Sequence, residues 1–358
     1  MLFIVIRVLG CLTKCTKYGK FDVAVFLNIY EGVFMKLTSR LMATAVLTLG
    51  AAVFSQTALA QAASNFPTKP LKFVVPFPAG SATDNVGRIL AQAMSEALGQ
   101  PIAVENKAGA NGIPGADAVK SATADPYTLL VTTSTTQAAN VSLYKKLPYD
   151  PVKDFTPIGK IGETGFILMV KPDFPAKDMK EFLTYAKANK LAYGHGSSGS
   201  LVSGALMAQL GGFEALGVPY KGIPPALTDL MGGQLQFAFA DVGNAVTQIN
   251  GGRLRGLGVT TAKRAGKAPT VPPIGETVKG YEVSAWFALM APANIPADAA
   301  KKLSETFRAV LAKPEVKEKM ANAGIDLDVQ DPAALAKTID AEIKKWSGWV
   351  KLAGIQPE

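Results

Sequence analysis

Short apolar segments alternate with helical patterns along the chain from residue 66 onward. The first apolar segment, Leu71 to Phe77, leads into a loop rich in Pro, Gly and Ser. Apolar residues then recur at spacings of three and four, which predicts a helix that ends before Gly99. This stripe consists of Val86, Ile89, Leu90, Ala93, Met94, Ala97 and Leu98. We expect Asp84 or Thr83 to cap the helix, and the alternation of strand and helix is typical of α/β proteins.

Six further segments are predicted to be strands, and most of them are followed by Gly, Ser, Thr or Asn. They are Ile102 to Glu105, Tyr127 to Val131, Phe166 to Val170, Leu235 to Ala240, Leu254 to Val259 and Trp286 to Met290. Ligands of open α/β sheets bind beyond the carboxyl ends of the strands, so these polar turns are the expected site. A last helical stripe consists of Leu335, Ile339, Ile343, Trp346 and Val350.

Two apolar strands, Phe166 to Val170 and Trp286 to Met290, bracket a self-contained α/β block. They are candidates for crossings between two lobes. On this interpretation one lobe is discontinuous and comprises residues 66–166 and 289–358, while residues 167–288 form the other lobe. About 300 residues suffice for two such lobes, each with its own core.

The segment 35–60 has the pattern of a cleavable secretory signal peptide. Lys36 and Arg40 precede the apolar run Leu41 to Phe54, and small residues before Gln61 offer a cleavage site. This run is shorter than the roughly 20 residues of a membrane-spanning helix. We expect export to the periplasm, with a mature chain that begins at about Gln61. Residues 1–34 are interpreted as the product of a mis-called start codon, with a genuine extended leader as the alternative.

Cleavage at this position changes the composition. Cys11 and Cys15 both lie upstream, so the mature chain has no cysteine for disulfides or thiolate metal sites. The net charge of +9 falls to +5, because 31 Lys and Arg then face 26 Asp and Glu. These basic residues are scattered, which is typical of a solvated surface rather than a nucleic-acid interface.

Three loops are candidates for binding a small anion. In the first, Gly80 and Ser81 precede a helix whose free N–H groups favour a carboxylate, although Asp84 opposes an anion and is equally well explained as a cap. In the second, Ser198, Gly199 and Ser200 offer hydroxyl and N–H donors. The third contains Tyr220 and Lys221, which are candidates for a hydrogen-bonding wall and a point charge. Asp241 ends a strand and either meets a ligand donor or caps the next helix.

His195, the single histidine of the chain, raises the alternative of a secreted hydrolase that uses Ser198 or Ser200 as nucleophile. The nucleophile-elbow pattern GxSxG is not met at this loop, and no acidic partner is evident nearby in sequence. One histidine also provides little material for a metal site. A binding protein without cofactor or catalytic residues is therefore favoured over an enzyme.

Several long segments together resemble the Bug, or TctC-type, family of solute receptors of tripartite tricarboxylate transporters, over residues 66–358. They read PFPAGSATD, VENKAGANGIPGA, YKKLPYDPVKDFTPI, VPYKGIPPALTDLMGGQLQ, GLGVTTAKR and AEIKKWSGWVKLAGIQPE. The resemblance implies a type II periplasmic-binding-protein fold, with two α/β lobes, a ligand cleft between them and two hinge crossings. It also implies a small carboxylate as ligand, held by loop groups and water.

The same resemblance implies which residues bind and which partners follow. The binding loops of the family correspond here to Gly80, Ser81, Asp84, Thr133, Ser134, Thr136, Ser198, Gly199, Ser200 and Asp241. The implied partners are the large and small integral membrane subunits of a tripartite transporter, and the receptor is expected to be a monomer. An accessory protein that reports the same ligand to a signalling receptor stays open as an alternative.

Overall fold

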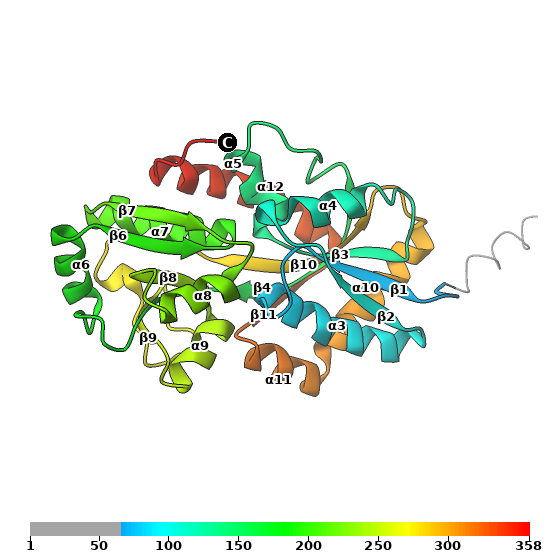
Figure 1. Ribbon diagram of the computed structural model, residues 1–358. Helices are drawn as coiled ribbons and strands as arrows, with labels where there is room; N and C mark the ends of the chain where they lie inside the picture. Colours follow the sequence, from blue (N-terminus) through cyan, green and yellow to red (C-terminus); the bar gives the residue numbers. More distant parts are fainter. Residues whose placement is uncertain (1–65) are drawn as a thin grey trace, which may run out of the picture. The chain divides into compact units, whose positions relative to one another are not determined.

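The computed structural model describes residues 66–358 (Figure 1). The predicted leader extension at 1–34 and the predicted signal peptide at 35–60 lie outside the described residues. No helix in the described part combines the length and the apolar composition that a membrane crossing requires.

The first of two β-sheets contains strands from both ends of the described chain. Its strands are β1 (Leu71–Val75), β2 (Ile102–Asn106), β3 (Thr128–Thr133), β4 (Phe155–Thr164), β10 (Ala285–Pro292) and β11 (Asp326–Gln330). The strand order is β11-β4-β10-β3-β1-β2. β1 runs parallel to both of its neighbours, whereas β10 is antiparallel to β3 and β4.

Successive side chains of a strand point to opposite faces of the sheet, so its apolar strands present apolar side chains on both faces. Helices cover both faces and bury these side chains. The helices are α3 (Ala82–Leu98), α4 (Ile113–Lys120), α10 (Ala297–Ala312), α11 (Pro314–Asn322) and α12 (Pro332–Leu352), with the short 3-10 turn η2 (Ala110–Gly112) before α4. Phe73 and Val75 share a buried cluster with α3, α10 and α11. Val74 instead packs with α4 and the first half of α12. The result is a three-layer α/β/α unit (Figure 1).

The second sheet has the same layered arrangement. Its strands are β5 (Phe166–Val170), β6 (Leu191–His195), β7 (Ala215–Pro219), β8 (Phe237–Asp241) and β9 (Arg255–Val259), in the order β7-β6-β8-β5-β9. Leu168 and Val170 pack with α6 (Met179–Ala188) and α7 (Ser198–Gly211). Ile167 packs on the other face, with α8 (Ile223–Met231) and α9 (Val242–Asn250).

Two crossings join the sheets. β4 leads into β5 through Gly165, and the segment after β9 and the 3-10 turn η4 (Ile274–Glu276) returns into β10. Thr260 connects the two crossings, because its hydroxyl accepts the Phe166 N–H at 2.9 Å and donates to the Val283 carbonyl at 2.6 Å. These hydrogen bonds hold both crossings at one place.

Two further elements link the units. After β3 the chain forms a helix with a π-helical turn, η3 (Thr135–Ala139), that continues as α5 (Asn140–Leu143). Ala138, Ala139 and Leu143 belong to the buried cluster of the second sheet, as do Trp346 and Val350 near the end of α12. α12 therefore packs against both units, its first half on the first sheet and its second half on the cluster of the second.

The predicted cap of the first helix was wrong. α3 begins at Ala82, and its N-cap is Ser81, whose hydroxyl accepts the Asp84 N–H at 3.2 Å. Asp84 lies inside the first turn, and its carboxylate accepts the Gly80 N–H at 3.0 Å. Both side chains thus satisfy free N–H groups at the start of the helix, with Ser81 in the capping position.

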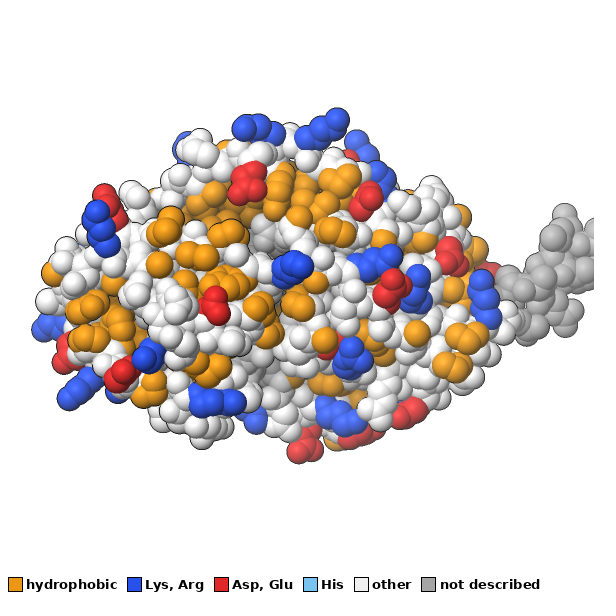
Figure 2. Space-filling model, viewed as in Figure 1, with side chains coloured by type: hydrophobic (Ala, Val, Ile, Leu, Met, Phe, Trp, Pro, Cys, Tyr) orange, Lys and Arg blue, Asp and Glu red, His pale blue; other side chains and the backbone are white. Residues whose placement is uncertain are grey.

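Figure 2 shows one face of the molecule, on which Lys and Arg side chains are interspersed with Asp and Glu. Mixed charges of this kind are the pattern of a solvated surface.

Candidate functional site

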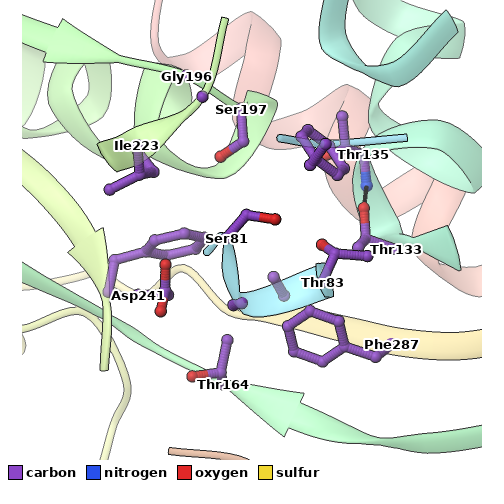
Figure 3. Close-up of a pocket in the computed structure, with 15 residues that line it drawn as sticks. Ser81, Thr83, Thr133, Thr135, Thr164, Gly196, Ser197, Ile223, Asp241 and Phe287 are labelled. Carbon is purple, nitrogen blue, oxygen red and sulfur yellow. Dashed lines mark hydrogen bonds between the residues drawn. The ribbon is translucent and has the colours of Figure 1, made fainter. Parts of the chain in front are cut away.

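A small cavity lies where the two units face each other, beyond the carboxyl ends of strands from both sheets. Its volume is about 50 Å³, which is room for a few water molecules. Six hydroxyl side chains line it: Ser81, Thr83, Thr133, Thr135, Thr164 and Ser197. Apolar walls come mainly from Phe77, Phe166, Phe287 and Ile223, and Gly196 and Gly222 also line the cavity. Figure 3 shows Ile223, Gly196 and Phe287 around it.

Five helices begin at this cavity. α3 starts after Ser81, the helix containing η3 starts next to Thr133, and α7, α8 and α9 start after Ser197, Gly222 and Asp241. The N-terminal end of a helix carries a partial positive charge and N–H groups without a helical partner. The convergence therefore favours an anionic ligand, although neither Lys nor Arg is among the lining residues.

Several lining hydroxyls are arranged to donate. Ser81 accepts the Asp84 N–H, and Thr133 accepts the Thr135 N–H at 3.1 Å. Ser197 also accepts the Ser200 N–H at 3.3 Å as part of a capping box, but its hydroxyl lies 3.2 Å from the Ser200 hydroxyl, whose own proton goes to the Ser197 carbonyl. The proton of Ser197 is therefore shared with Ser200, whereas those of Ser81 and Thr133 are not shared within the described residues. A hydroxyl whose oxygen is used by a helix N–H keeps its proton for another acceptor. Such protons suit the oxygens of a carboxylate.

Asp241 differs from the rest of the lining. It is the one ionisable side chain among the described residues that line the cavity, and it is buried. It caps α9, accepting the Asn244 N–H at 3.1 Å and the Asn244 amide at 3.1 and 2.9 Å. Burial raises the pKa of Asp241, and the hydrogen bonds from Asn244 oppose this shift. Asp241 therefore caps α9, one of the two roles considered from the sequence, and it also lines the cavity, where it could meet a ligand donor.

Of the residues selected from the sequence, Ser81, Thr133 and Asp241 line the cavity. Asp84 lies behind this lining, and its carboxylate also accepts hydrogen bonds of 2.9 Å from Arg88 and from Asn106. Burial raises the pKa of Asp84, but the hydrogen bonds from Arg88, the Gly80 N–H and Asn106 outweigh it and keep the pKa below its ordinary value. The charge of Asp84 is therefore matched by these donors, and Asp84 is not among the residues that line the cavity.

The other selected residues support the loops from within. The Thr136 hydroxyl donates to the Thr133 carbonyl at 3.1 Å, and Ser134 is buried with no hydrogen-bond partner for its hydroxyl in the described part of the chain. Ser198 donates to Asn140 at 3.3 Å, which links α7 to the helix after β3. The Ser200 hydroxyl accepts the Gly196 N–H at 3.0 Å.

Three more of them lie at the margins. Gly199 packs against the ring of Phe166, so that a Cβ at this position would lie 2.1 Å from the ring. Tyr220 donates to Asp229 at 2.7 Å, away from the lining, and Lys221 is exposed.

His195 is not a lining residue either. Its ring lies 5.9 Å from that of Tyr193, and burial lowers the pKa of His195 to about 4. Ser198 and Ser200 make the hydrogen bonds described above, and in the described residues neither is paired with the imidazole. A neutral histidine without a serine partner lacks the geometry of a nucleophile and its base.

Sequence reasoning missed six polar or backbone contributors to the cavity, together with the aromatic walls; the six are Thr83, Thr135, Thr164, Gly196, Ser197 and Gly222. A signal existed for Ser197, because it stands at the boundary between a strand and a helical pattern, where serine is a preferred cap. No comparable local signal marks Thr164, which reaches the cavity because β4 ends there, next to the crossing at Gly165.

Comparison with known proteins identifies the family and the fold of the chain. Residues 86–355 match the family described as tripartite tricarboxylate transporter family receptor. A protein from the TAR-I ttuE-ttuC' intergenic region of Agrobacterium vitis is 36% identical over 304 residues, which cover 83% of this chain and 88% of the relative.

Two solved structures from Rhodopseudomonas palustris are also similar. Rpa4515, solved with adipate, has a TM-score of 0.80 and 32% identity, with 82% of this chain and 100% of that chain covered. MatC, solved with bound malate, has a TM-score of 0.72 and 32% identity, with 80% and 100% covered. The fold is that of periplasmic binding proteins of this type, as the sequence resemblance had predicted. The chain therefore belongs to the tripartite tricarboxylate transporter receptor family, whose members are solute-binding proteins.

Proposed function

We propose that this chain captures a small carboxylate in the periplasm, in the cavity between its two units, and delivers it to the membrane subunits of a tripartite transporter. The observation that carries this proposal is the convergence of five helix N-termini and six hydroxyls on one small cavity. Such an environment stabilises negative charge without a buried cation.

The apolar part of the lining supports an organic anion over an inorganic one. Phe77, Phe166 and Phe287 offer surface for a carbon skeleton, which a phosphate or sulfate ion would leave unused. The relatives solved with adipate and malate point to the same ligand class. Of the residues selected from the sequence, we propose Ser81, Thr133 and Asp241 as direct or water-bridged contacts.

We propose that the ligand is enclosed by a hinge motion of two lobes, residues 66–166 with 289–358 and residues 167–288. The division into two sheets supports two lobes with crossings close to these bounds, since the second sheet includes β5 from Phe166 and the first includes β10 from Ala285. Thr260 provides a fixed point between the crossings. Ligand affinity then depends on contacts that both lobes make in the closed state.

The receptor acts after export, as a mature monomer that begins at about Gln61, with the segment 1–34 absent from it. It makes and breaks no bond. The low pKa of His195 and the absence of a serine pairing among the described residues support binding without catalysis.

A thermal-shift screen of residues 61–358 tests the ligand class. The panel contains mono-, di- and tricarboxylates, with the corresponding amides as neutral controls. A ligand at 100 times its Kd stabilises the native state by about 2.7 kcal/mol, which gives a clear increase in Tm. Shifts with a few acids and none with their amides are expected. Folded, ligand-free protein that responds to no acid would overturn the proposal.

A further inference from the structure

Asp241 gives the cavity two ends of different character. In Figure 3, Thr83, Thr133 and Thr135 lie on one side, and Asp241 lies on the other side with Thr164. The first group comes from α3, from the end of β3 and from the start of the helix after it, whereas Asp241 comes from the end of β8. A ligand that spans the cavity therefore meets hydroxyl donors at one end and a carboxylate acceptor at the other.

The hydrogen bonds of Asp241 leave it as an acceptor toward the cavity. In the described part of the chain, its hydrogen bonds from other residues come from the backbone and the side chain of Asn244. Each carboxylate oxygen has about two lone-pair directions, so acceptor capacity remains after the Asn244 bonds are made. Among the described residues, Lys and Arg are absent from the cavity lining, so no cation there screens Asp241.

The consequence is a preference among acids. A ligand carboxylate close to Asp241 would place two acceptors together and repel, whereas a hydroxyl or ammonium group would complete a hydrogen bond in a buried site. From this juxtaposition of Asp241 with the hydroxyl-lined end we infer that the cleft selects acids bearing a hydrogen-bond donor on the carbon chain, hydroxy or amino acids, over unsubstituted acids of equal length. This inference rests on the proposed carboxylate function and names the ligand class within it.

Calorimetric titration with matched series tests the inference. One series is succinate, malate and aspartate, and a second is glutarate, 2-hydroxyglutarate and glutamate, so that length is constant while H, OH and NH₃⁺ vary. In the series whose length fits the cavity, we expect the donor-bearing acids to bind about tenfold or more tightly than the unsubstituted acid, because a site with a buried acceptor rejects a ligand that leaves it unpaired.

The Asp241→Asn variant assigns the preference to this residue. Asparagine caps helices as well as aspartate, so α9 is expected to form, while the charge that favours an ammonium is lost. The affinity ratio of the amino acid to the unsubstituted acid should fall toward one. Asp178→Asn is the matched control, because Asp178 caps α6 in the same way, accepting the Glu181 N–H at 2.8 Å, and lies outside the cavity lining. Its ratios should equal those of the wild type.

The outcomes separate this inference from the proposed function. Unsubstituted acids that bind the wild type as tightly as their hydroxy and amino counterparts would overturn the inference and leave a carboxylate receptor. A preference that survives unchanged in Asp241→Asn would also overturn it. Binding of none of the acids, in protein shown to be folded, would remove the proposed function itself.

Discussion

Asp84 is a binding candidate by sequence and a scaffold residue in the structure. All hydrogen-bond partners of its carboxylate donate to it: the Gly80 N–H and Arg88 to one oxygen, and Asn106 to the other. An amide at this position must turn its NH₂ group toward at least one donor. We therefore expect Asp84→Asn to lower the free energy of unfolding by about 2 kcal/mol at pH 7, measured by urea denaturation.

The pH dependence of this difference has a defined sign. The pKa of Asp84 is below its ordinary value of 3.8 in the folded protein, so its contribution is complete above that pH and is lost as the pH falls through the lowered pKa. The wild-type and variant stabilities should converge at low pH. Asp298→Asn, at an exposed position in the first turn of α10, should change stability by less than about 0.5 kcal/mol. Equal stability of Asp84→Asn and wild type at pH 7 would contradict this account.

At the scale of single residues, the sequence predicts only some of the hydroxyl side chains that line the cavity. Thr133, Ser134, Thr135 and Thr136 follow one another, and the lining includes the first and third of them. They lie where a strand passes into a π-helical turn, and a change of helical period rotates successive side chains by amounts that no simple pattern encodes. The resemblance pointed to a loop that contributes to the cavity lining, while the local geometry decides which of its side chains line it.

At the scale of elements, strands were predicted correctly where the apolar pattern is regular and were missed where it is interrupted. The predicted strands with continuous apolar runs, such as Phe166–Val170, occur in the structure. β4 was missed because its sequence, FTPIGKIGET, includes two glycines, a proline and a lysine, and its pairing with β10 contains two register shifts. It is a strand because β10 and β11 flank it, which is tertiary context rather than local propensity.

One carboxylate of α12, that of Glu342, joins this helix to β10 through hydrogen bonds. Glu342 accepts the indole N–H of Trp286 and that of Trp346, each at 3.2 Å, and both indoles are buried. Glu342→Ala would leave two buried donors without a partner. We expect a loss of about 2–4 kcal/mol in the free energy of unfolding, followed by urea denaturation with tryptophan fluorescence.

Glu342→Gln distinguishes the contribution of these hydrogen bonds from that of the negative charge of Glu342. Glu342→Gln retains one carbonyl oxygen as acceptor and should lose clearly less stability than Glu342→Ala. Glu305→Ala, at an exposed position of α10, should be close to neutral. If Glu342→Ala proves as stable as Glu305→Ala, α12 is held by apolar packing alone.

At the scale of the whole described molecule, two loops of opposite units touch across the cavity. Gly222 precedes α8, and a Cβ at this position would lie 2.4 Å from the Cγ and 2.7 Å from the Cδ of Pro78, in the loop after β1. The backbone of Gly222 is extended, so alanine is compatible with its conformation. Gly222→Ala should therefore hinder closure and weaken the tightest-binding acid about tenfold or more, by calorimetry, because overpacking of this kind costs roughly 1–3 kcal/mol.

Further variants test whether the contact between residue 222 and Pro78 causes the weaker ligand binding of Gly222→Ala. Gly232→Ala, at the end of α8, meets its nearest atoms at 3.5 Å, an ordinary contact, and should bind as the wild type does. Pro78→Ala removes the two opposing carbon atoms, so adding it to Gly222→Ala should restore part of the affinity. Small-angle scattering should show that the ligand compacts the wild type and compacts Gly222→Ala less. Full compaction of Gly222→Ala together with weak binding would instead mean that the methyl group obstructs the ligand itself, since Gly222 also lines the cavity.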